Sequence, residues 1–96
     1  MPMFVLALEM DLHIVESRSL KAKRQVVKSI IESARRRYGV AAAEVDHQDT
    51  WQRAALGFAV VSGRARHAEE VMDDVERHVW SYPEVQVLTT ERRWLE

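Results

Sequence analysis

A period-two pattern of large apolar residues near the N-terminus constrains the fold of this 96-residue chain more than any other feature. Between Phe4 and Ile14, every second position holds a large apolar residue: Leu6, Leu8, Met10, Leu12 and Ile14. The intervening positions hold Val5, Ala7, Glu9, Asp11 and His13. Because side chains in a strand point alternately to its two sides, this pattern predicts a strand with one buried face and one mixed face.

Two segments with helical periodicity lie further along the chain. In the first, the apolar residues fall within an arc of about 40° on a helical projection: Leu20, Val27, Ile31, Ala34 and Tyr38. Ser17 or Ser19 can cap its start and Gly39 can end it. The second segment, Arg64 to Tyr82, follows Ser62-Gly63 and precedes Pro83, and carries an apolar stripe of Ala65, Ala68, Val71, Met72, Val75, Val79 and Tyr82. His67 and His78 fall outside that stripe, which predicts surface histidines.

Three further strands complete the predicted order. Residues Val40 to His47 and Arg53 to Val61 flank a short polar turn, which predicts a hairpin. Glu84 to Leu95 is the last strand. The order βαββαβ predicts an α+β, ferredoxin-like sandwich that forms a single domain over residues 1–96, with a four-stranded antiparallel sheet and both helices on one face. In this arrangement the first strand is central and the second is an edge.

The composition narrows the class of protein. The absence of cysteine excludes disulfides, thiolate zinc sites, iron–sulfur clusters and Cys nucleophiles. We expect a cytosolic protein, because no basic residue precedes the short apolar N-terminus and no apolar run reaches the roughly 18–20 residues of a membrane span. The lack of Asn and Cys suits a thermophile.

Charge is segregated between the two predicted helices, although the net charge is only −1. The first helix holds seven basic residues and one acidic residue, whereas the second holds three basic and five acidic residues. A basic stripe along a helix is typical of a surface that contacts phosphates. The same pattern also occurs on solvated helix faces, so both readings stay open. The predicted RNA contacts on this helix are Lys21, Lys23, Arg24 and Lys28.

Polar and aromatic residues crowd the predicted hairpin between positions 46 and 53. Trp51 is suited to stack on a base and Arg53 to bind a phosphate. Asp46, His47 and Asp49 carry groups that bind divalent cations, but their spacing matches no defined motif, so we expect no metal and no cofactor. The alternative is structural, with Asp49 capping the turn and Trp51 covering a sheet edge.

The side of the sheet without helices offers a second candidate surface. Asp11 and His13 point the same way from the first strand, and we expect Glu44 and Asp46 beside them. A possible polar site therefore includes Asp11, His13, Asp46, His47 and Asp49. A His–Asp pair is suited to general base chemistry. No nucleophile is placed beside this pair, which favours a protein without catalytic activity. Small residues on the third strand (Ala55, Gly57 and Ala59) favour close approach of a second subunit or a neutral ligand, with Arg92 or Arg93 balancing Glu9 and Asp11.

Several motifs together resemble the YlxP-like family of small bacterial proteins. They are Ser19-Leu20-Lys21-Ala22-Lys23-Arg24, Ala43-Glu44-Val45-Asp46-His47-Gln48-Asp49, Trp51-Gln52-Arg53-Ala54, Leu56-Gly57 and Glu91-Arg92-Arg93-Trp94-Leu95. The resemblance extends over essentially the whole chain and implies a ferredoxin-like fold. Members are often encoded beside genes for translation initiation and ribosome maturation, which implies a link to RNA or ribosome assembly. The family has no established catalytic residues to carry over.

Two functional hypotheses follow. The first is a cytosolic binding module for ribosomal RNA or a ribosomal particle, acting through the basic helix and the 46–53 hairpin. The second is a homodimer or higher oligomer, or a small-ligand module, that uses the helix-free sheet face. Neither hypothesis involves a membrane.

Overall fold

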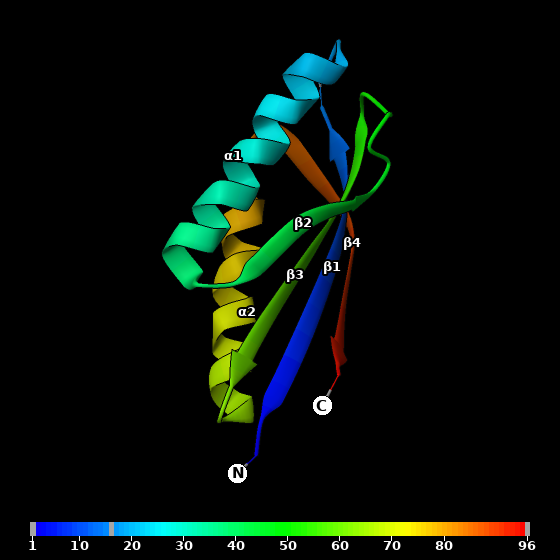
Figure 1. Cartoon of the computed structure of the whole chain (residues 1–96). Helices are drawn as coiled ribbons and strands as arrows, with labels where there is room; N and C mark the ends of the chain where they lie inside the picture. Colours follow the sequence, from blue (N-terminus) through cyan, green and yellow to red (C-terminus); the bar gives the residue numbers. More distant parts are fainter. Residues whose placement is uncertain (1, 16, 96) are drawn as a thin grey trace.

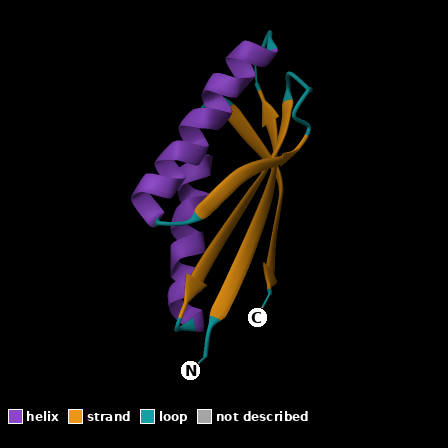
Figure 2. Ribbon diagram, viewed as in Figure 1, coloured by secondary structure: helices purple, strands orange, loops and turns teal. Residues whose placement is uncertain are grey.

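The computed structural model describes residues 2–15 and 17–95. Its elements are β1 (Phe4–Ile14), α1 (Leu20–Tyr38), β2 (Ala41–Asp46), β3 (Arg53–Ser62), α2 (Ala65–Trp80) and β4 (Val85–Trp94). The strands form one sheet in the order β2-β3-β1-β4, and all neighbouring strands are antiparallel. Both helices cover the same face (Figures 1 and 2). The ferredoxin-like α+β fold, with β1 central and β2 at an edge, is therefore confirmed.

The core lies between the inward face of the sheet and the two helices. The alternate apolar side chains of β1 are at most 1% exposed, because they pack in one cluster with residues from both helices. From β3 the cluster takes the bulkier side predicted by the sequence: Ala54, Leu56, Phe58 and Val60. No helix within residues 2–15 and 17–95 is long and apolar enough to cross a membrane.

Both ends of α1 follow local sequence signals. The Ser19 side chain accepts a hydrogen bond from the Ala22 backbone amide at 3.0 Å and so caps the first turn. Gly39 ends the helix with φ of 66°, a left-handed conformation that glycine adopts without a Cβ penalty. Helix α2 ends at Trp80, with Ser81 as its C-cap, rather than at the predicted Tyr82, because a residue that precedes proline disfavours the helical region.

The buried stripe of α1 differs from the predicted one. Lys23, Ile30 and Ser33 are buried, whereas Leu20 and Ile31 are only half-buried. The helix is therefore rotated relative to the purely apolar arc. This rotation places a charged side chain, Lys23, beneath the helix.

Two β-bulges decide which side chains reach each face of the sheet. Glu44 faces α1 by ordinary alternation with the buried Ala42, and the register shift between Glu44 and Asp46 then places Asp46 on the helix-free side. The expectation that Glu44 lies beside Asp11 is therefore wrong, and the position of Asp46 is as expected. In β4 a second shift, at Leu88, lets Arg92 face α2.

Lys23 fastens α1 to β2 and to the chain that follows it. Its ammonium group is fully buried, lies 2.7 Å from a Glu44 carboxylate oxygen and donates a hydrogen bond to the His47 backbone carbonyl. Removing one partner of a buried pair leaves the other charge without compensation. This contact therefore determines where the 47–52 turn sits against the helix.

We expect Lys23→Met to lower the free energy of unfolding by about 3 kcal/mol, because it leaves the Glu44 carboxylate unpaired. Lys21→Met, at an exposed position on the same helix, is the matched control and should change stability by less than about 0.5 kcal/mol. Urea denaturation measures both effects. The double variant Lys23→Met/Glu44→Leu should recover most of the loss, and a stable Lys23→Met single variant would contradict this role.

Candidate nucleic-acid interface

An exposed row of cations runs along α1. Lys21, Arg24 and Lys28 are all exposed, and the Lys28 side chain retains 74% of its accessible surface. Within the described ranges, neither Lys21 nor Arg24 lies in an ion pair, and Lys28 meets Glu32 only at 4.0 Å. These charges are available to a polyanion. We call Lys21, Arg24 and Lys28 the basic row.

A groove with a volume of about 420 Å³ lies between α1 and the start of β2. Arg24, Lys28 and Arg35 border it, and the apolar side chains of Val27 and Ile31 also line it. The Arg35 guanidinium donates a hydrogen bond to the Ala42 carbonyl at 2.5 Å, so it is held against the β2 backbone. Glu32 and Glu44 also line the groove, so it combines three cations and two carboxylates with an apolar lining.

The structure corrects the expected role of Lys23. This residue was predicted to contact phosphates with its helix neighbours, but its side chain is buried and paired with Glu44. A phosphate cannot reach it without displacing the helix. Burial of this lysine depends on an acid 21 positions later in the chain, which no periodicity within α1 indicates.

The hairpin residues separate into an exposed and an engaged group. The Trp51 side chain is 53% exposed on the turn between β2 and β3. Arg53, by contrast, donates to an Asp11 carboxylate oxygen at 2.7 Å on the neighbouring strand. The charge of Arg53 is therefore already balanced within the chain. Of the two predicted hairpin contacts, only Trp51 is presented freely to solvent.

The predicted polar site is only partly assembled. Asp11, Asp46 and His47 line a small depression of about 130 Å³ together with Glu9 and Glu91, and His47 Nε2 lies 3.9 Å from Asp11 Oδ1. His13 and Asp49 do not line this depression. Among the residues that the structure describes, no three His, Asp or Glu side chains have metal-binding geometry.

His78 is buried, contrary to the prediction of a surface histidine. Its ring Nε2 lies 2.5 Å from the Ser33 hydroxyl, and Tyr38 and Tyr82 meet the ring edge-on. Burial and the nearby Arg37 guanidinium lower the pKa of His78. The sequence does contain a signal for this burial, because His78 lies three positions after Val75 and four before Tyr82, which is the spacing of the apolar stripe. The prediction that placed His78 outside the stripe is therefore wrong.

The fold and these surfaces together define a small ferredoxin-like α+β protein with one strongly basic helix. The chain matches a family model described as "Protein of unknown function (DUF503)" over residues 5–92. It is also 34% identical over 86 residues to "Uncharacterized protein YlxP" of Bacillus subtilis (strain 168), a match that covers 90% of this chain and 94% of that protein. The chain therefore belongs to this YlxP-like family.

The lowered pKa of His78 predicts that acid weakens the fold. The folded state favours the neutral ring, so the unfolded chain binds a proton more readily, and stability should fall as pH drops below 6.5. Denaturation curves for the protein and for His78→Gln should converge as the pH is lowered through this range. His67→Gln, at an exposed position on the same helix, should lose as much stability at acid pH as the unmodified protein does. An unchanged pH profile in His78→Gln would contradict the assignment.

Proposed function

We propose that this protein is a cytosolic binding module for structured RNA or a ribosomal particle, and that α1 is its contact surface. The observation that carries the proposal is the basic row of three exposed cations, two of which, Arg24 and Lys28, border a groove beside β2. At a rise of about 1.5 Å per residue, Lys21 and Lys28 are separated by roughly 10 Å along the helix axis, and Arg35 lies roughly another 10 Å further on. A row of this length spans several phosphates of a nucleic-acid backbone.

The 47–52 turn extends this surface at the N-terminal end of α1. Lys23 connects the helix to the His47 carbonyl, and the Gln52 side chain donates to the Ser17 carbonyl at 3.3 Å. Figure 1 shows this turn and the start of α1 at the same end of the molecule. Trp51 on this turn therefore supplies a base-stacking platform at the end of the molecule where α1 begins with Lys21 and Arg24.

The helix-free sheet face is unsuited to the same role. Its central strand presents Glu9 and Asp11, and β4 adds Glu91. Carboxylates in this position repel phosphates. The basic helix and the acidic part of the sheet face lie on opposite sides of the sheet, which favours α1 as the side that meets the RNA (Figure 1).

Replacing the basic row should weaken binding and its dependence on salt. For Lys21→Ala/Arg24→Ala/Lys28→Ala, the negative slope of log K against log salt should become shallower by about 2 to 3. The loss of three phosphate contacts means that fewer counterions are released on binding. Filter binding of ribosomal RNA across a salt series measures this slope. The matched control, Arg64→Ala/Arg66→Ala/Arg77→Ala, removes the same charge at the N-cap of α2 and within that helix, and should bind like the unmodified protein. An equal loss of RNA affinity in both triple variants would indicate a nonspecific charge effect and would refute α1 as the binding surface.

Trp51→Ala should lower RNA affinity by about tenfold, because a base–aromatic stack contributes roughly 1–3 kcal/mol. Trp51→Phe should retain most of the affinity, since it keeps an aromatic face. Trp94→Ala is the control, because Trp94 is also exposed and is the last residue of β4, whose end lies near the chain termini and away from the turn (Figure 1). Fluorescence anisotropy with labelled RNA measures all three. An unaltered Trp51→Ala affinity would remove the turn from the interface.

A further inference from the structure

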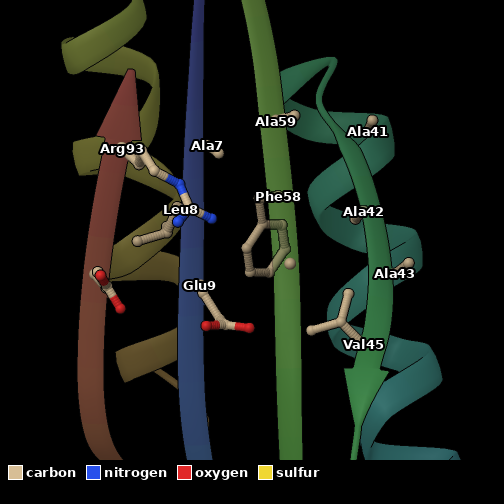
Figure 3. A pocket seen from close by; sticks show the side chains of 12 residues that line it. Ala7, Leu8, Glu9, Ala41, Ala42, Ala43, Val45, Phe58, Ala59 and Arg93 are labelled. Atoms are coloured by element: carbon tan, nitrogen blue, oxygen red, sulfur yellow. The ribbon is translucent and has the colours of Figure 1, made fainter. Parts of the chain in front are cut away.

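The helix-free face of the sheet contains a shallow apolar depression with a volume of about 380 Å³. Its lining consists largely of small residues from three strands: Ala7, Ala41, Ala43, Gly57 and Ala59. Figure 3 shows this depression, with Val45 on β2 at one side and Arg93 reaching from β4 across β1 at the other. Small side chains at the centre of a sheet permit close approach of another surface.

Further apolar side chains border this face. Val45 is 47% exposed, and Val61 and Leu95 are 65% and 54% exposed. Four strands spaced about 4.8 Å apart, with about nine residues each, present roughly 500 Å² of projected area. A standard protein interface buries about 800 Å² per partner, and accessible area exceeds projected area. The face is thus large enough for a modest, specific interface.

The charges on this face are not balanced within the chain. Glu9 and Glu91 are direct cross-strand partners in the β1–β4 register. Like charges opposite each other destabilise a sheet unless a cation lies between them. Arg93 is exposed and, within residues 2–15 and 17–95, makes no ion pair. The face therefore carries a two-carboxylate site and a cation side by side.

The neighbouring charged side chains are already paired within the chain. Arg53 already neutralises Asp11 at 2.7 Å, and Arg92 faces α2, where it pairs with Asp73 and Glu76 at 2.8 and 2.5 Å. Arg92 is one of the two arginines expected to balance the acids of the sheet face, but its ion pairs with α2 keep it from doing so. Arg93 is the remaining one, and it lies two positions from Glu91 on the same strand.

We infer that two copies of this chain pair through their helix-free faces around a two-fold axis. A two-fold axis brings the same patch together on both copies, so each unit must present both signs of charge. Arg93 of one copy would lie over Glu9 and Glu91 of the other, and the small residues of the two depressions would pack between these charged sites. This pairing leaves both α1 helices on the outside, so the dimer presents two basic rows.

Charge reversal tests the pairing directly. Glu9→Arg and Arg93→Glu should each weaken the dimer at least tenfold, because each places like charges against each other twice across the axis. Analytical ultracentrifugation over a concentration series measures the dissociation constant. The matched controls are Glu69→Arg and Arg66→Glu, which make the same charge changes at exposed positions on α2 and should leave the dimer intact.

Two rescue experiments separate the proposed contact from misfolding. The double variant Glu9→Arg/Arg93→Glu should form a homodimer again, and an equimolar mixture of the two single variants should form a heterodimer. A strict monomer at several hundred micromolar would overturn the inference, even if the protein binds a small molecule on this face. A dimer that is insensitive to both single reversals, or not restored in the double variant, would also overturn it.

Discussion

The apolar row of β1 is sealed beneath the helices, with each of its five side chains at most 1% exposed. Because strand side chains alternate, burying this row forces Glu9, Asp11 and His13 onto the opposite side of the sheet. The same constraint acts on β3, where Ala54 and Leu56 point inwards while Gly57 and Ala59 line the open face. The alternation of side chains along β1 and β3 therefore places large apolar residues on the helix-covered side of the sheet. It places acidic and small residues on the open side.

Lys23 links this layered core to the proposed binding surface. Its contacts with Glu44 and the His47 carbonyl hold the start of the 47–52 turn against α1. Burying an ammonium group is costly unless it is paired and hydrogen-bonded, and both conditions are met here. A positive charge that at first resembled a phosphate contact instead positions the exposed residues around it. Lys21 and Arg24 remain free on the outer side of the same helical turn.

Features governed by local chemistry were predictable from the sequence. The limits of β1, the Ser19 cap, the Gly39 end of α1 and the order of elements follow from periodicity and from residues adjacent in the chain. Features that depend on distant partners were not. The bulge beyond Glu44 and the one at Leu88 depend on how strands pair, and the hydrogen-bonding partner of His78, Ser33, lies 45 positions away in the sequence. These nonlocal contacts decide which charges stay available: Arg93 and Arg24 do, whereas Arg92 and Lys23 do not.

We propose that the two sides of the sheet meet two partners, with RNA on the helical side and a second copy on the open side. Sedimentation of the native protein from cell extract through a sucrose gradient tests the proposed association with RNA or the ribosome through α1. At low salt the protein should migrate with ribosomal subunits, and raising the salt should return it to the light fractions, because the contact depends on counterion release. Migration in the light fractions at low salt, with folded protein and intact subunits in the same gradient, would contradict the account.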